Sequence, residues 1–184
     1  MTAVKARLRK TVEDFLKLPE GTPAELIDGE ILMSPSPRSR HQRIVRRLLR
    51  ILDGHVERRS LGEVFDGLDV HLPSGDVVEP DLVFVRSGRR IVRDWIRGVP
   101  DLVVEIMSLT SDLRDRVVKR RLYASNGVPE YWLVVPDEDG LEVMSLKGRV
   151  YPPGAWFTGR DPVRSRVLPG LRLRFSELVR LSDS

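Results

Sequence analysis

Three short apolar runs limit what this 184-residue chain can fold into. They cover residues 82–85, 102–107 and 130–135, the last of which reads EYWLVV. Runs that are apolar at successive positions are typical of central strands in a sheet covered on both faces. Because helices normally provide that cover, the runs predict an α/β or α+β fold with a mixed central sheet flanked by helices.

Two helices are predicted from the spacing of apolar residues. In residues 39–58, one face is apolar and arginines occupy much of the rest. The apolar positions are Ile44, Val45, Leu48, Leu49, Leu52 and Val56. A second helix over 112–126 ends at Asn126-Gly127, a favourable C-terminal stop.

Shorter elements complete the predicted organisation. Thr11 and Asp14 form a capping pair for a helix over 11–18. The Asp28-Gly29 pair within 24–33 predicts an N-terminal hairpin. Further strand-like pieces lie at 63–66, 68–72, 141–146, 149–151 and 171–175, the last three forming a strand-rich tail. No repeat or linker divides the chain, so we expect one domain over 1–184.

The composition limits the chemistry. The chain has no cysteine, which excludes thiolate zinc sites, iron–sulfur clusters and cysteine nucleophiles. Its 3 histidines stand apart in the sequence, so a metal would be bound mainly by oxygen atoms, which favours Mg²⁺ or Mn²⁺. The net charge of +4 permits an anionic partner such as nucleic acid but does not require one.

The sequence gives no sign of membrane insertion or secretion. No apolar run approaches the roughly 20 residues that a membrane span needs. Residues 1–10 are polar and basic, unlike a secretory signal. We therefore expect a cytoplasmic protein without a membrane partner.

Two acids occupy positions in these runs where a carboxylate is costly. Asp81 follows Pro80 and opens one run, and Glu105 lies inside another. A buried carboxylate needs a metal, a cation or a proton. If the two strands are neighbours, both acids can meet near one end of the sheet and form a metal site with oxygen ligands. The alternatives are that Asp81 caps a turn and that Glu105 pairs with an arginine.

The helix over 112–126 offers a cation for these acids. Asp115, Lys119 and Tyr123 are spaced i, i+4, i+8 and form one stripe. The chain has few lysines beside its many arginines, so a lysine here indicates that a compact ammonium group was needed. The alternative is a solvated surface pair between Asp115 and Lys119.

Three more residues are candidates for the same site. Glu25, in the predicted hairpin, could reach the metal or its water, or could pair with an arginine instead. Gln42 and Arg43 begin the arginine-bearing helix, which could contact backbone phosphates. Two acids, a lysine and a metal suit phosphodiester hydrolysis, in which charge develops on the phosphoryl oxygens.

Seven segments follow one another in a recognisable order. They are ELIDGEILMSPSPRSRHQRI (25–44), GEVFDGLDVHL (62–72), VVEPDLVFV (77–85), PDLVVEIMS (100–108), the Asp115–Lys119–Tyr123 helix, GVPEYWLVVP (127–136) and VLPGLRL (167–173). Over about residues 11–180 the chain resembles the Uma family of restriction-endonuclease-like proteins, in the PD-(D/E)XK nuclease superfamily.

The resemblance implies a fold and an activity. The fold would be an αβββαβ core, and the activity a Mg²⁺- or Mn²⁺-dependent endonuclease acting on DNA. Asp81 and Glu105 match the two acids of the motif and would bind the metal, with Glu25 in support. Lys119 would act at the attacking water, while Asp115 and Tyr123 would hold the lysine or contact substrate. A homodimer is a further possibility, since superfamily members often pair to cut two strands.

One departure from the superfamily pattern keeps a second function open. The motif expects a lysine two residues after the second acid, where this chain has Met107. Lys119 would replace it from the next helix, or the chain is an inactive nucleic-acid-binding or interaction module with the same fold. A glycoside hydrolase using the acid pair is disfavoured, because sugar grooves are usually lined with aromatic residues and only 6% of this chain is aromatic.

Overall fold

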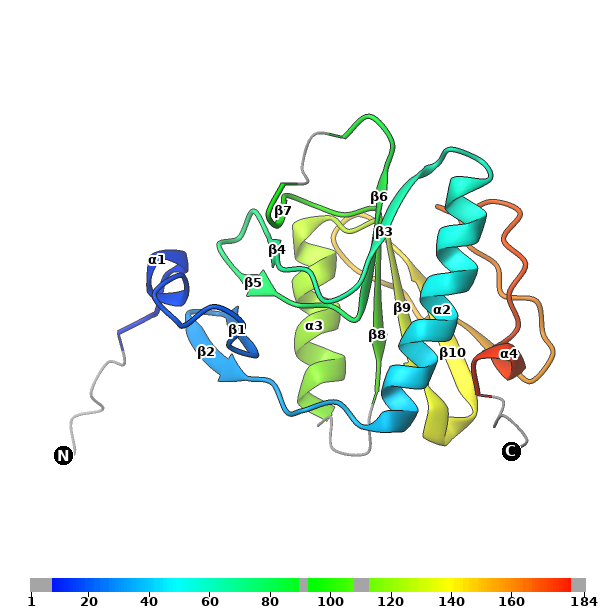
Figure 1. Cartoon of the computed structure of the whole chain (residues 1–184), viewed down its shortest axis with the longest axis horizontal. Coiled ribbons are helices and arrows are strands. Elements are labelled where there is room, and N and C mark those ends of the chain that lie inside the picture. Colours follow the sequence, from blue (N-terminus) through cyan, green and yellow to red (C-terminus); the bar gives the residue numbers. More distant parts are fainter. Residues whose placement is uncertain (1–7, 90–92, 108–112, 180–184) are drawn as a thin grey trace.

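The computed structural model describes residues 8–89, 93–107 and 113–179, with side chains from residue 116 onward in the last range. Two sheets organise this part of the chain, and two long helices accompany the larger one (Figure 1). The arrangement confirms the mixed sheet flanked by helices that the apolar runs predict.

The main sheet contains all three apolar runs as neighbouring strands. Its order is β11-β10-β9-β8-β6-β3. The strands are β3 (Gly62–Phe65), β6 (Leu82–Arg86), β8 (Leu102–Ile106), β9 (Glu130–Val135), β10 (Gly140–Ser145) and β11 (Ala155–Thr158). β8 and β9 are parallel, with Glu105 opposite Leu133, and the other pairs are antiparallel. The sheet is therefore mixed, as predicted.

The two long helices, α2 (Ser39–Glu57) and α3 (Leu113–Asn126), lie on opposite sides of the main sheet (Figure 1). Side chains alternate between these sides along each strand. Val104 packs in the core beneath α2, and Val103 packs with Tyr123 of α3. By the same alternation, Glu105 projects to the α3 side. The chain order α2-β3-β6-β8-α3-β9 is the expected αβββαβ core.

A second sheet, with the order β2-β1-β5-β4-β7, brings the N-terminal hairpin to the core. Its strands are β1 (Ala24–Ile27), β2 (Glu30–Met33), β4 (Val70–His71), β5 (Val77–Val78) and β7 (Ile96–Arg97). The hairpin turns at Asp28 and Gly29, with φ of 53° and 76°, the positive values that a tight hairpin turn requires. Before it, α1 (Val12–Phe15) carries the predicted capping box of Thr11 and Asp14.

The predicted strand-rich tail is partly wrong. Residues 149–151 and 171–175 form no strands, and only the isolated bridges Lys147–Val150 and Pro162–Arg174 involve them. Gly148, with φ of 61°, makes a tight turn directly before the first segment, which leaves no length for a strand pair. The tail instead contributes β11 and a short helix, α4 (Phe175–Val179), and a 3₁₀ turn (Pro136–Glu138) joins β9 to β10.

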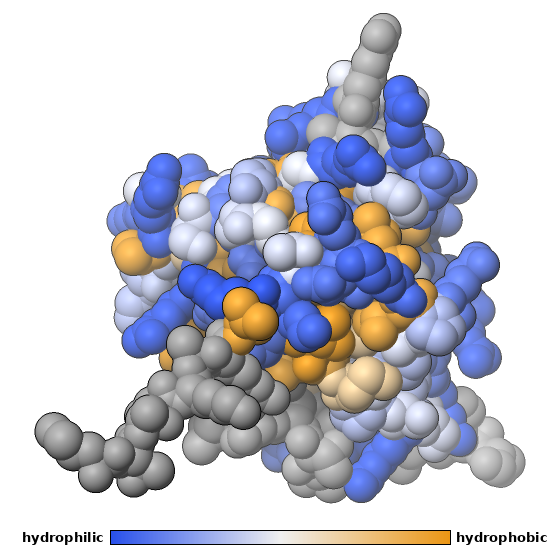
Figure 2. Space-filling model, turned by 90° about the vertical axis from the view of Figure 1, so that its left-hand side faces the viewer, coloured by the Kyte–Doolittle hydropathy of each residue, from blue (hydrophilic) through white to orange (hydrophobic). Residues whose placement is uncertain are grey.

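The surface over the hairpin side of the molecule is mainly hydrophilic. Figure 2 shows that face, with apolar side chains gathered in patches between charged ones. No helix in the described part of the chain combines the length and apolar character needed to cross a membrane.

A buried acid ties the tail to the main sheet. Glu130, at the start of β9, is 0% exposed. Its Oε1 accepts hydrogen bonds from Trp132 Nε1 at 2.8 Å and from Ser165 Oγ at 2.6 Å, and its Oε2 accepts one from the Arg166 amide at 2.7 Å. Both carboxylate oxygens are thus used, which compensates for the burial of the group.

We predict that Glu130→Gln lowers the free energy of unfolding by about 2 kcal/mol, because an amide nitrogen cannot accept one of these hydrogen bonds. Urea denaturation measures the change. Glu63→Gln, on the exposed side of β3, is the control and should stay within about 0.5 kcal/mol of the unchanged protein. Equal stability of the two variants would contradict the anchoring role of Glu130.

Candidate active site

A cavity of about 360 Å³ lies where the second sheet meets one end of the main sheet and the start of α2. Four of the candidate residues predicted from the sequence line this cavity, each from a different segment of the chain. Glu25 comes from β1, Asp81 immediately precedes β6, Glu105 lies on β8 and Lys119 on α3. Gln42 of α2 also lines the cavity. Segments far apart in the sequence therefore converge on one place.

The Lys119 ammonium group joins two of these acids. Its Nζ lies 2.9 Å from Glu105 Oε1 and 2.9 Å from Glu25 Oε1. The side chains of all three are just over a tenth exposed. Burial acts to lower the pKa of Lys119, but the charges of Glu105 and Glu25 outweigh it and hold that pKa above its usual value. The lysine is therefore a fixed positive charge.

Glu105 is held by two donors on one oxygen. Besides Lys119, the Tyr123 hydroxyl donates a hydrogen bond of 2.7 Å to Oε1. Burial raises the pKa of Glu105 to about 7, with Lys119 opposing the shift and the charges of Asp81 and Glu25 adding to it. The raised pKa of Glu105 therefore reflects its burial first, with the neighbouring carboxylates adding to it.

Asp81 is oriented by a different set of contacts. Its Oδ2 accepts a 2.7 Å hydrogen bond from the backbone amide of Ile106, which places it beside the strand that carries Glu105. His41 Nε2 lies 3.0 Å from Oδ1 and 3.1 Å from Oδ2. This hydrogen bond raises the pKa of His41, against the opposing effect of burial. Asp81 is therefore fixed from both β8 and α2.

Glu25 is fixed by the loop before Asp81. Its Oε1 accepts a hydrogen bond of 3.1 Å from the Glu79 amide, and its own strand pairs with β5 at Leu26–Val77. Glu79 also lines the cavity, and burial raises its pKa, with Asp69, Glu25 and Asp81 adding to the effect. The hairpin and the strand that leads to Asp81 are thus positioned together.

The remaining predicted residues lie in different surroundings. Tyr123 is 0% exposed behind Glu105, so it can hold that carboxylate but cannot contact substrate in this arrangement. Arg43 is exposed on α2 and does not line the cavity. The side chain of Asp115 lies outside the described residues, so its predicted role stays a prediction. Glu105 pairs with a lysine and a tyrosine, not with the arginine that was the alternative.

Sequence reasoning missed His41 and Glu79. The three histidines are isolated in the sequence, so only the position of His41 directly before the candidate Gln42 indicates a role for it. Glu79 directly precedes the Pro80-Asp81 pair, and that adjacency was the available signal.

The chain belongs to the Uma2 family, described as "Putative restriction endonuclease", which it matches over residues 12–176. The structure is similar to that of a "putative nuclease belonging to DUF820" from Anabaena variabilis, with a TM-score of 0.79 and 23% sequence identity. The likeness covers 92% of this chain and 97% of that one and shows a shared fold. No curated protein matches the sequence.

We predict that Lys119→Met lowers the free energy of unfolding by about 3 kcal/mol, because it leaves the carboxylates of Glu25 and Glu105 buried without their cation. Adding Glu105→Gln to this variant should restore part of the loss. Thermal and urea unfolding measure both changes. Lys147→Met, at an exposed position, is the control. If Lys119→Met were as stable as that control, the lysine would not be compensating buried charge.

Proposed function

We propose that this protein is a metal-dependent endonuclease that hydrolyses phosphodiester bonds in DNA. The observation that carries the proposal is that Asp81 and Glu105 line one cavity beside the Lys119 ammonium group. Membership in a family described as putative restriction endonucleases supports the reaction class. The choice of DNA follows from that family description and the net charge of +4, which suits a polyanionic substrate.

The residues present fit Mg²⁺ or Mn²⁺. Such ions are commonly bound by one or two carboxylates, with water and substrate phosphate completing the coordination. Asp81 and Glu105 are the carboxylates we assign to this role. Across the described ranges, no three His, Asp or Glu side chains are grouped to hold an ion by themselves, so the remaining ligands would be water and phosphate. A bound ion would polarise the phosphoryl oxygen and lower the pKa of a water molecule.

Lys119 supplies the fixed positive charge for the reaction. Its ammonium group would orient the attacking water and stabilise the extra negative charge of the pentacovalent phosphorus. In that step the water oxygen forms a bond to phosphorus, the bond to the leaving ester oxygen breaks, and that oxygen takes up a proton. Glu25 has a positioning role, since its contact with Nζ holds the lysine in place.

Two further contacts hold the acids. Tyr123 donates to Glu105, and His41 hydrogen-bonds Asp81, so both carboxylates are oriented before any substrate arrives. Gln42 lines the cavity and is assigned to substrate contact, and Arg43 to a phosphate further along the DNA. A homodimer stays a prediction from the family resemblance.

The contact of Lys119 with Glu105 favours the active enzyme over an inactive binding module. Met107 stands where the superfamily has its lysine, and its sulfur lies 2.9 Å from Arg116 Nε. An ammonium group nevertheless reaches Glu105, from α3. Lys119 of α3 thus offers an ammonium group in place of the lysine that is missing at position 107, which favours an active enzyme.

We predict that Asp81→Asn and Glu105→Gln each slow DNA cleavage by about 10²-fold or more, since each removes a charge from the proposed metal site. Conversion of supercoiled plasmid to nicked and linear forms in Mg²⁺ or Mn²⁺ measures the rate, with a chelator as the blank. Glu63→Gln is the control, because it removes a carboxylate that does not line the cavity.

Two results would count against the proposal. Either variant cutting at the unmodified rate would refute the assignment of that acid. DNA binding without cleavage in either metal, by the unmodified protein, would favour the inactive binding module.

A further inference from the structure

A basic hollow lies at the other end of α2 from the candidate site. Its volume is about 550 Å³, and it is formed between the C-terminal end of α2 and the loop before α4, at the upper right of Figure 1. It is lined by Arg50, Ile51, His55, Arg58, Arg59, Gly170, Leu171 and Arg172. Four of these eight residues are arginines and none is an acid.

The positive charge of this hollow is not balanced by nearby acids. Within the described residues, none of its four arginines forms an ion pair with a carboxylate. Other arginines of the chain do form such pairs, for example Arg40 with Asp137 and Arg116 with Glu138. Asp53 and Glu57 lie on the same helix but do not line the hollow. Guanidinium groups without carboxylate partners, gathered in one place, are suited to bind an anion.

A buried histidine, His55, also lines the hollow, and the positive charge of the neighbouring arginines affects its pKa. His55 is 3% exposed, and Arg59 Nη1 lies 3.3 Å from its Nδ1, so Nδ1 is the acceptor and the ring is neutral. Burial lowers the pKa of His55, and the charges of Arg59 and Arg58 lower it further, against a smaller opposing effect of the Pro169 carbonyl.

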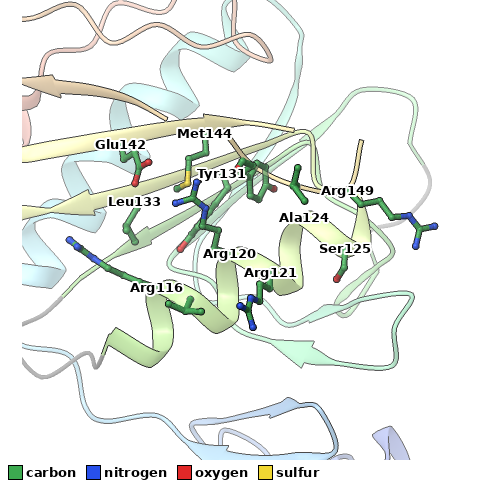
Figure 3. A pocket seen from close by; sticks show the side chains of 13 residues that line it. Arg116, Arg120, Arg121, Ala124, Ser125, Tyr131, Leu133, Glu142, Met144 and Arg149 are labelled. Atoms are coloured by element: carbon green, nitrogen blue, oxygen red, sulfur yellow. Dashed lines mark hydrogen bonds between the residues drawn. The ribbon is translucent and has the colours of Figure 1, made fainter. Parts of the chain in front are cut away.

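A larger pocket beside α3 also has arginines but differs in their contacts. This pocket of about 610 Å³ appears in Figure 3, with Arg116 and Arg120 along α3 and Glu142 across from them. Arg116 is paired with Glu138, and Arg120 donates to the carbonyls of Tyr151 and Pro152. These two guanidinium groups are used within the protein, and Glu142 adds a negative charge to the pocket, so the hollow at the end of α2, which no acid lines, is the stronger candidate for an external anion.

We propose that this hollow, which we name the distal arginine site, binds a backbone phosphate of the nucleic acid at a distance from the point of cleavage. The residues of α2 that line the two sites are centred near Gln42 and His55, so at about 1.5 Å per residue the sites lie about 20 Å apart along the helix. Arg43, Arg46 and Arg50 are exposed and share one side of α2 between them. At about 3.4 Å per phosphate along a strand, a duplex of some six base pairs would be needed to reach both.

The three histidines provide a direct test. We would follow the ring resonances of His41, His55 and His71 through a pH titration, with a chelator present so that no DNA is cut. A 20-base-pair duplex should raise the pKa of His55, because a bound phosphate offsets the charges of Arg58 and Arg59. His71, in the second sheet, should not change. Inorganic phosphate at the same phosphate concentration should have a much smaller effect.

Two outcomes of the titration would overturn the proposal. An unchanged His55 would mean that no phosphate binds there. An equal response to inorganic phosphate and to the duplex would show an adventitious ion only.

Charge removal gives a second, independent readout. The double variant Arg58→Gln/Arg172→Gln should bind the 20-base-pair duplex about tenfold more weakly, and the slope of log affinity against log salt should fall by about 0.9, the value for one phosphate contact. The control is Arg9→Gln/Arg86→Gln, which removes two charges from arginines paired with Asp28 and Asp101. A hairpin with a three-base-pair stem, too short to reach both sites, should bind both double variants alike. An equal loss in the control, or an equal loss with the short stem, would contradict the distal site.

This inference depends on the proposed function only for the identity of the anion, and the two can fail separately. If Asp81→Asn cleaved normally while Arg58→Gln/Arg172→Gln bound DNA weakly, the active-site assignment would fall and the distal arginine site would stand.

Discussion

The contact of one lysine with two glutamates holds together the parts of this protein that form its cavity. Lys119 belongs to α3, Glu105 to the main sheet and Glu25 to the second sheet, and both carboxylates lie 2.9 Å from the same Nζ. Separating these three elements would leave a buried carboxylate or ammonium group without an opposite charge. The buried charges therefore hold the three elements together. The same constraint fixes the position of the positive charge that we assign to phosphodiester hydrolysis.

The two acids assigned to the metal differ in their surroundings. Asp81 is held by a backbone amide of β8 and by His41, and its orientation is set by the register of the main sheet. Glu105 is buried against Tyr123 and Lys119, and its pKa is raised to about 7. Carboxylates in such different environments are typical of sites in which each group has its own task. The two nevertheless line one cavity, as a shared ion requires.

Much of the fold could be predicted because its signals are local. The Asp28-Gly29 turn, the capping box of α1 and the apolar strands depend on neighbouring residues, and the structure confirms them. The tail was harder, because Gly148 interrupts an otherwise strand-like stretch and α4 is only five residues long. The placement of the tail depends on contacts with distant elements, and a local sequence pattern does not contain information on those contacts.

The same contrast between local signals and contacts with distant elements applies to the candidate site. Lys119 could be singled out from helical spacing, but its pairing with Glu25 spans the length of chain between β1 and α3 and depends on how the two sheets meet. His41 illustrates the limit, since nothing in its neighbourhood indicates that α2 begins beside Asp81. The family resemblance supplied the order of the acids along the chain, and the three-dimensional structure supplied the contacts between them.

The central claim is that Asp81 and Glu105 bind one divalent ion beside the Lys119 ammonium group. The most direct test is a crystal soaked in Mn²⁺, with anomalous scattering used to locate the ion. The account predicts an anomalous peak between the carboxylate oxygens of Asp81 and Glu105. A crystal with both side chains ordered and no peak between them at saturating Mn²⁺ would contradict it.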